Sequence, residues 1–230
     1  SEVSADVLKN IDKISCIEVY TEKFFIKDHD ANFEKILGEV PVLLHGLDLS
    51  IGSSGPIDET YLSNLKDVLR NVEFPWFSEH ISLTKEGEIE LGHLMPVQFT
   101  EEAADRIADK ATTVQSLSDK PFLLENITYY YPIPGSTMSE AAFINRILDK
   151  ADCGMLLDIN NLYINSKNLQ YDPIDFLNQL SEERIVEAHM AGGSHKYSML
   201  IDTHANSISP EVWKLFEKIM KVTPVNCVII

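Results

Sequence analysis

The sequence contains few cysteines and no apolar segment long enough to cross a membrane. Among its 230 residues there are only three cysteines, Cys16, Cys153 and Cys227, and they lie far apart without CxxC spacing. An odd number of dispersed cysteines argues against a disulfide framework, so we interpret them as small buried residues of strands. No charged segment followed by an apolar one opens the chain, so no signal peptide is predicted. These absences predict a protein of the reducing cytoplasm with no membrane partner.

Basic residues are also scarce. The chain has 19 lysines and arginines against 36 aspartates and glutamates, which gives a formal net charge of −17. Such a chain repels nucleic-acid phosphate unless it carries a local basic patch, and the sequence shows none. Nucleic acid is therefore excluded as an expected partner. The acidic excess indicates solubility first, and second that metal ions hold some of the carboxylates together.

Glycine-rich phosphate-binding turns of the GxGxxG or P-loop kind are missing as well. The chain instead alternates apolar runs of strand length with helical patterns. The runs are Cys16–Tyr20, Val42–His45, Trp76–His80, Phe122–Glu125, Gly154–Asp158, Ile185–His189 and Val225–Ile230. Helices are predicted over Ser1–Ile11, Leu62–Val72, Thr100–Leu117, Ala141–Lys150, Pro173–Leu180 and Pro210–Lys221. Continuous apolar strands that alternate with helices are typical of a parallel sheet covered by helices, so residues 1–230 are predicted to form a single α/β domain.

Polar residues at the ends of nearly all these runs favour a closed barrel over an open sheet. An open sheet concentrates its site at one switch point, whereas a (β/α)8 TIM barrel gathers the carboxyl ends of all its strands around one mouth. A barrel of this kind needs eight strands, and the sequence offers seven runs. The chain also begins in a helix-like stretch and ends inside the run Val225–Ile230. We therefore expect a TIM barrel whose first strand and C-terminal end are missing from this chain.

The ends of the predicted strands would bring metal-capable side chains to the barrel mouth. These are His45, His80, Glu125, Asp158, Asn161, His189, Asp202 and His204, the last two from the IDTH segment. Histidine nitrogens and carboxylate oxygens without cysteine are ligands for iron, manganese or zinc. Eight such groups are more than one ion can use, whereas two or three ions with a bridging carboxylate would use them all.

Simpler interpretations exist for single members of this set. A lone histidine after an apolar run is more often a core or rim residue than a ligand, and Asp158 could cap the segment that follows it. A buried carboxylate nevertheless costs several kcal/mol unless it is paired or bound to metal. Few lysines or arginines lie near these strand ends, so separate simple explanations for all eight residues are improbable. His93 and His195 lie in polar, loop-like surroundings and are predicted to be surface residues.

Two other catalytic interpretations have weaker support. Ser78 and Ser82 flank His80, but no GxSxG elbow accompanies them, which argues against a serine hydrolase. Glu79 and Glu125 could form the acid pair of a glycosidase. Glu79 is adjacent to His80 in a strand, however, and should point to the opposite side of the sheet. That interpretation also leaves the histidines unexplained.

Six motifs in order across nearly the whole chain resemble those of one known family. They are HGLDLSIGS (45–53), SEHIS (78–82), LLEN (123–126), GMLLDINNLYINSKN (154–168), EAHMAG (187–192) and IDTH (201–204) with a later Val-Trp pair. Together they are similar to the multinuclear non-haem iron-dependent oxidases, of which the methanobactin-biosynthesis oxidase is a member. That family modifies cysteine residues of ribosomally made precursor peptides, with dioxygen as co-substrate.

The resemblance implies a (β/α)8 barrel with two or three iron ions, in a mixed Fe(II)/Fe(III) state, at its mouth. It also implies a cysteine-containing precursor peptide as substrate and a small partner protein that recruits the leader of that peptide. Carried over by motif, the first iron would be bound by His45, His80 and Glu125. The second would be bound by Glu125, Asp158 and His189, and the third by Asn161, Asp202 and His204.

This sequence departs from the family pattern in two places. Relatives carry an acid on the last strand as a further ligand of the second iron, and this chain reaches Ile230 without one. Gly193 stands where relatives have a second histidine, so its role is lost or passes to nearby His195. The alternative function is a TIM-barrel hydrolase or isomerase that uses two or three zinc or manganese ions.

Overall fold

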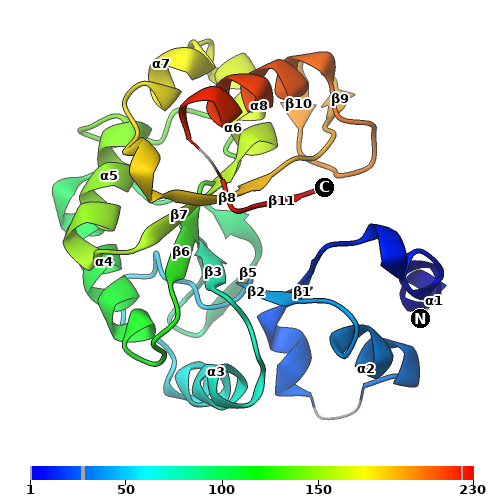
Figure 1. Ribbon diagram of the computed structural model, residues 1–230. Coiled ribbons are helices and arrows are strands. Elements are labelled where there is room, and N and C mark those ends of the chain that lie inside the picture. Colours follow the sequence, from blue (N-terminus) through cyan, green and yellow to red (C-terminus); the bar gives the residue numbers. More distant parts are fainter. Residues whose placement is uncertain (1, 27–28, 224) are drawn as a thin grey trace.

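The computed structural model describes residues 2–26, 29–223 and 225–230, and at its centre a parallel sheet forms a nearly closed barrel (Figure 1). Seven strands are hydrogen-bonded in the order β1-β2-β3-β6-β7-β8-β11. Their bounds are β1 Ile17–Tyr20, β2 Val42–Gly46, β3 Phe77–His80, β6 Phe122–Glu125, β7 Gly154–Asp158, β8 Ile185–His189 and β11 Cys227–Ile229. Each coincides with one of the predicted runs, and every neighbouring pair is parallel. The predicted α/β barrel is therefore confirmed.

The first and last strands of this sheet face each other across a seam. The described residues form no hydrogen-bonded register between β1 and β11, but Cys16 Sγ lies 3.1 Å from Cys227 Sγ. All three cysteines are free thiols. Cys153 is buried as predicted, whereas Cys16 and Cys227 are only half-buried, because one side of each seam strand has no neighbouring strand to cover it.

The strands are buried on both faces because helices cover the outside and side chains fill the inside. In β6, Phe122 and Leu124 belong to an apolar cluster that includes Ile107 of helix α4, Glu101–Gln115. Leu123 and Glu125 alternate with them along the strand and so point into the barrel. The polar residue that ends the apolar run is therefore the last inward-facing side chain of the strand. The same alternation holds in the neighbouring strands.

Helices surround the barrel, and their start signals match the sequence. Besides α4 they are α1 Glu2–Lys9, α2 Ala31–Leu37, α3 Glu59–Asn71, α5 Glu140–Ala151, α6 Ile159–Leu169, α7 Pro173–Leu177 and α8 Pro210–Val222. Thr100 and Ser139 cap α4 and α5 by accepting a backbone N–H, as their positions predict. α7 ends at Leu177 rather than Leu180. Within the described ranges, no helix has the length and apolar character that crossing a bilayer requires.

Two antiparallel hairpins and two helices were not predicted from the sequence. The hairpins are β4 Leu83–Glu86 with β5 Ile89–Met95, and β9 Ser194–Lys196 with β10 Met199–Ile201. They follow β3 and β8 along the chain, where a barrel places the loops of its mouth. The unpredicted helices are α2 and α6, and α6 starts directly after the last residue of β7.

Candidate metal centre at the barrel mouth

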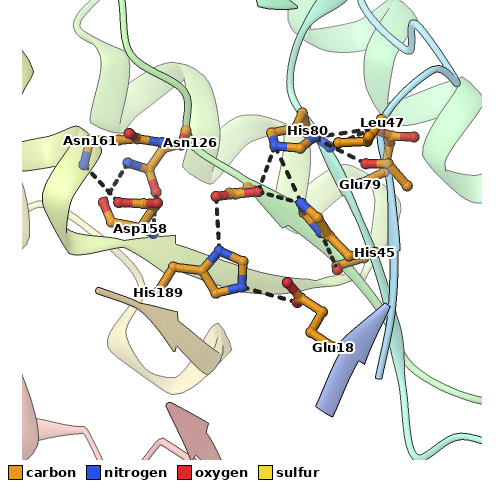
Figure 2. Close-up of polar contacts among 12 residues, drawn as sticks. Glu18, His45, Leu47, Glu79, His80, Asn126, Asp158, Asn161 and His189 are labelled. Carbon is orange, nitrogen blue, oxygen red and sulfur yellow. Dashed lines mark hydrogen bonds and ion pairs between the residues drawn. The ribbon is translucent and has the colours of Figure 1, made fainter. Parts of the chain in front are cut away.

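Three neighbouring strands bring His45, His80 and Glu125 into contact inside the barrel. The register pairs His80 of β3 with Glu125 of β6, and His45 ends β2 on the other side of β3. Glu125 Oε2 lies 3.2 Å from His45 Nε2 and 3.0 Å from His80 Nε2, and the two nitrogens are 3.3 Å apart. All three side chains are buried. These atoms therefore form a nearly equilateral triangle (Figure 2).

The outer nitrogens of both imidazoles have partners that fix the tautomer. His80 Nδ1 lies 3.0 Å from the backbone oxygen of Gly46, which can only accept a hydrogen bond, so Nδ1 carries the proton. His45 Nδ1 lies 2.8 Å from Ser78 Oγ, and that hydroxyl donates to the Leu44 carbonyl at 3.3 Å. Ser78 Oγ is then the acceptor for His45 Nδ1–H. In the neutral rings, both Nε2 atoms therefore present lone pairs to the centre of the triangle.

Two nitrogen lone pairs and a carboxylate oxygen at this separation repel one another unless a cation lies among them. Glu125 Oε2 is buried and accepts no hydrogen bond from any described residue. A metal ion at the centre of the triangle would satisfy this buried, inward-facing oxygen. Imidazole rings whose other N–H is held by a carbonyl or hydroxyl are also the usual metal-binding arrangement. The residues present fit a divalent metal ion with nitrogen and oxygen ligands.

The protonation of the three residues in the triangle also favours a cation at its centre. Burial lowers the pKa of His80, but Glu125 and Glu79 outweigh it and raise this pKa to about 9. Burial raises the pKa of Glu125, and the surrounding His80, His189 and His45 bring it well below its usual range. Without metal, the centre therefore holds a proton on His80 at neutral pH. A bound metal ion would replace that proton.

On the opposite side of Glu125 lie His189 and Asp158. His189 Nδ1 is 3.4 Å from Glu125 Oε1, and the three side chains are buried and close enough to share one ion. Burial, and then the charge of Glu125, raise the pKa of Asp158 to about 7. Asn126 holds Asp158 in place through two hydrogen bonds to its backbone, at 2.9 and 3.0 Å. The carboxylate itself caps α6, with Oδ1 accepting from the backbone N–H of Asn161 at 2.7 Å. Asp158 therefore does cap the segment that follows it, as the sequence analysis considered. The cap uses Oδ1, and Oδ2 does not take part in this hydrogen bond.

The third predicted set is gathered less tightly than the others. Asn161 is buried, and its Oδ1 accepts no hydrogen bond from the described residues, so this oxygen could bind an ion. Asp202 and His204 lie at the rim, where His204 Nε2 is 3.3 Å from Asp202 Oδ1 and the histidine is exposed. It is Asn160, not Asn161, that contacts Asp202, with Nδ2 donating at 3.0 Å. All three predicted residues nevertheless line one cavity with the buried centre.

That cavity opens at the mouth and measures about 730 Å³. Its lining combines the histidines and carboxylates of the centre with apolar residues such as Leu47, Leu94 and Met190. No lysine or arginine is among the lining residues in the described part of the chain. The charged or titratable side chains that line the cavity are therefore carboxylates and histidines.

The other side chains singled out in the sequence lie outside the triangle. Glu79 points away from the barrel interior as predicted, and its Oε2 accepts from the backbone N–H of Leu49 at 3.2 Å. His93 and His195 are exposed, as predicted. The sequence did not single out Glu18 or Glu187, two acids inside the strands β1 and β8. Their signal was a charged residue within an otherwise apolar run, IEVY and IVEAH.

Comparison with known families matches residues 1–230 to the family described as "RiPP precursor modification enzyme MbnB/TglH/ChrH", where RiPP denotes a ribosomally synthesised and post-translationally modified peptide. A UPF0276 protein of Anaeromyxobacter sp. strain Fw109-5 is 37% identical over 191 residues, which are 83% of this chain and 68% of that protein. A UPF0276 protein of Shewanella loihica is 39% identical over 184 residues, 80% of this chain and 66% of that protein. The chain thus spans about two thirds of the length of these relatives.

Solved structures share the fold at low sequence identity. Endonuclease IV from Thermus thermophilus superimposes with a TM-score of 0.61 at 13% identity, over 98% of this chain and 86% of that one. A D-tagatose 3-epimerase-like protein gives a TM-score of 0.59 at 14% identity, over 96% of this chain and 84% of that one. Likeness at this level concerns the barrel architecture and not the reaction.

The family match and the relatives agree with the motifs. The family match covers all 230 residues, and the two relatives exceed one third identity over most of the chain. The match therefore spans every motif residue that the structure places at the barrel mouth. The resemblance that the motifs indicated is thereby confirmed. The chain belongs to the MbnB/TglH/ChrH family of RiPP precursor modification enzymes, the family of the multinuclear iron-dependent oxidases.

Proposed function

We propose that this chain is the catalytic domain of a multinuclear iron-dependent oxidase that uses dioxygen to modify cysteine residues of a ribosomally synthesised precursor peptide. The observation that carries the proposal is the triangle of His45, His80 and Glu125, in a chain of this family. Its donor atoms are nitrogen and oxygen without sulfur, a set that suits iron. The triangle is buried at the base of a cavity large enough to admit a peptide side chain.

The proposed ligands fall into three groups. His45, His80 and Glu125 would hold the first iron, and Glu125 would bridge to a second iron that Asp158 and His189 also bind. Asn161, Asp202 and His204 would hold a third. The buried positions of the first two groups support this assignment, as does the unbonded oxygen of Asn161. The rim position of Asp202 and His204 suits an ion that meets the substrate.

When bound, the irons would supply Lewis acidity and one-electron oxidation. The chain's own residues position and shield them. Ser78 and the Gly46 carbonyl orient the two imidazoles, so that both Nε2 atoms face Glu125. The apolar part of the cavity lining, which includes Leu47, Leu94 and Met190, would exclude bulk water around a bound peptide. We further propose that a small partner protein delivers the leader of the precursor peptide, and that the chain works in the cytoplasm.

The metal content of anaerobically purified protein tests the proposal. We expect two or three irons per chain by elemental analysis, with a Mössbauer spectrum that shows high-spin iron in oxygen and nitrogen coordination. His80→Ala should lose iron, whereas His93→Ala, a matched change of an exposed histidine, should keep it. Iron-loaded protein should consume dioxygen when a peptide that contains cysteine is added. The same peptide with serine in place of cysteine is the control.

The donor set also suits zinc and manganese. Full occupancy by either metal, with no iron retained under anaerobic conditions and no dioxygen consumption, would contradict the oxidase. Such a result would favour the alternative function, a hydrolase or isomerase that uses two or three ions in the same barrel mouth. The His80→Ala variant would lose metal in that case too, so the identity of the metal decides between the two functions.

A further inference from the structure

His189 presents its two ring nitrogens to two different carboxylates. The residue ends β8, and its Nδ1 lies 3.4 Å from Oε1 of Glu125. Its Nε2 lies 3.0 Å from Oε2 of Glu18, which comes from β1. Figure 2 shows the imidazole between Glu18 on one side and Asp158 on the other. Each nitrogen of the ring therefore has its own partner.

Glu18 reaches His189 across the interior of the barrel. No hydrogen-bonded register joins β1 to β8 in the part of the chain that the structure describes. Val19, the next residue of β1, packs against the apolar cluster, so Glu18 points inward. His189 is buried and Glu18 is half-buried. A charge-assisted hydrogen bond of this kind holds the imidazole more firmly than an ion pair at the surface would.

The contact with Glu18 fixes which edge of the ring faces the barrel mouth. Rotation of the imidazole by 180° about its Cβ–Cγ bond would put Cδ2 where Nδ1 lies and Cε1 where Nε2 lies. Glu18 and Glu125 would then both face carbon atoms instead of nitrogen. With Glu18 as the acceptor, Nε2 carries the proton of the neutral ring, and Nδ1 keeps its lone pair. That lone pair is directed to the side of Glu125 and Asp158.

We propose that Glu18 is a positioning residue, which accepts the Nε2–H of His189 and thereby directs Nδ1 to the ion that Glu125 and Asp158 also bind. The inference deepens the proposed function, because it rests on His189 as a ligand of that second ion. A carboxylate that accepts the outer N–H of a metal-bound imidazole orients the ring and makes it a stronger ligand.

The proposal gives His189 the opposite tautomer from the histidines of the first ion. His45 and His80 carry their protons on Nδ1 and present Nε2 to the metal. His189 would carry its proton on Nε2 and bind through Nδ1. This difference can be measured in the protein directly.

The tautomer of His189 in the zinc-loaded chain tests the proposal and requires neither iron nor dioxygen. In protein labelled with ¹⁵N at histidine, two-bond proton–nitrogen correlation spectra distinguish a protonated nitrogen from a metal-bound one. We expect a protonated Nε2 and a zinc-bound Nδ1 in His189, and the reverse in His45 and His80. His189→Asn identifies the signals of His189 by their loss. A zinc-bound Nε2 in His189, or His189 signals that zinc leaves unchanged, would overturn the proposal.

Variants of Glu18 separate the hydrogen bond from the charge. Glu18→Ala removes the acceptor, and the zinc-binding step that His189→Asn loses should become about 10- to 100-fold weaker. Glu18→Gln keeps an oxygen that can accept from Nε2–H, so it should restore most of that affinity together with the Nε2–H tautomer. If Glu18→Ala binds zinc as tightly as the unaltered chain, or if Glu18→Gln is no better than Glu18→Ala, Glu18 does not position His189.

Glu187→Gln is the matched control for the loss of a nearby negative charge. Glu187 Oε1 lies 3.9 Å from His189 Nε2, which is beyond hydrogen-bond distance. Its Oε2 accepts from Trp76 Nε1 at 2.7 Å, and an amide oxygen can accept the same bond. This variant should keep the tautomer of His189 and leave the affinity within about threefold of the unaltered chain. A loss as large as that of Glu18→Ala would overturn the assignment to Glu18.

Failure of this proposal can be distinguished from failure of the proposed function. If the chain retains no iron but zinc-loaded His189 binds through Nδ1, the oxidase is refuted and the role of Glu18 stands. If iron is retained and dioxygen is consumed while His189 binds through Nε2, the oxidase stands and the role of Glu18 is refuted. Should Glu18→Ala fail to fold, the spectrum of the unaltered zinc-loaded chain decides alone.

Discussion

The hydrogen bond between Ser78 and His45 should control how tightly the first ion binds. Ser78 Oγ lies 2.8 Å from His45 Nδ1 and is the acceptor that keeps the proton on this nitrogen. Ser78→Ala removes the acceptor and leaves a buried N–H unpaired. Loss of such a supporting contact typically weakens metal binding about 10- to 100-fold. That range corresponds to about 1.4 to 2.7 kcal/mol of binding free energy. Much of the loss should come from the tautomer, because the proton is then free to move to Nε2, the nitrogen that faces Glu125.

Competition with a chromophoric zinc chelator measures this affinity in the metal-free chain. Thr84→Val is the matched control, because Thr84 Oγ1 is also a buried hydroxyl but makes no hydrogen bond to a described residue. Removal of that hydroxyl should leave the affinity within about threefold of the unaltered chain. If Ser78→Ala binds zinc as tightly as Thr84→Val, while His45→Ala has lost the ion, the tautomer assignment is wrong. Thermal unfolding of both variants should show that the folded state persists.

Three further predictions concern burial and charge. The pKa of His80 is about 9 without metal, so metal affinity should rise as the pH increases from 6 to 9 and level off above it, which isothermal titration at several pH values would show. Burial raises the pKa of Glu140 from 4.5 to about 7, so its contribution to stability is complete below pH 4.5 and falls by about 3 kcal/mol as the pH rises through 7. Urea unfolding at pH 5 and pH 8 should show this fall, and Glu140→Gln should remove it even though Tyr129 can still donate to the amide oxygen. A side chain at Gly192 would overlap the backbone of Asn206, so Gly192→Ala should cost about 1 to 3 kcal/mol in the same assay. An unchanged unfolding midpoint for Gly192→Ala would contradict that packing.

The barrel strands could be predicted because each is a continuous apolar run that is buried on both faces. Their polar ends could be predicted for the same reason, since a polar residue at the last inward position interrupts an otherwise apolar pattern. Glu125 is the clearest example: FLLE is buried throughout, and only its last residue is polar. The hairpin β4–β5 gave no such pattern, because its second strand is exposed along most of its length and reads as a polar loop around Gly87 and Gly92.

The contact of Glu18 with His189, and the position of Glu187 beside it, could not be identified from the sequence. Glu18 and Glu187 lie within strands, where a single acid gives no indication of its partner across the barrel. Only the curvature of the sheet brings Glu18 of β1 within 3.0 Å of His189 in β8, a strand with which β1 has no hydrogen-bonded register among the described residues. The contacts of Asn160 and Asn161 could not be predicted from the sequence either, because they depend on where α6 begins. In a helix, neighbouring residues point about 100° apart, so Asn160 and Asn161 face different partners. The structure accordingly gives the contact with Asp202 to Asn160.

Through Asp158, the stability of helix α6 depends on protonation and metal binding at the barrel mouth. One carboxylate oxygen caps the first turn of α6, so protonation of Asp158, or its removal from an ion, changes the stability of that turn. The far end of the helix is attached to the β9–β10 hairpin, since Asn168 exchanges two hydrogen bonds with the backbone of Leu200, at 2.9 and 2.7 Å. That hairpin leads directly to Asp202 at the rim. Amide hydrogen exchange in α6 should therefore slow when the centre is loaded, and the rim should become ordered together with it, as one cooperative unit rather than as separate loops.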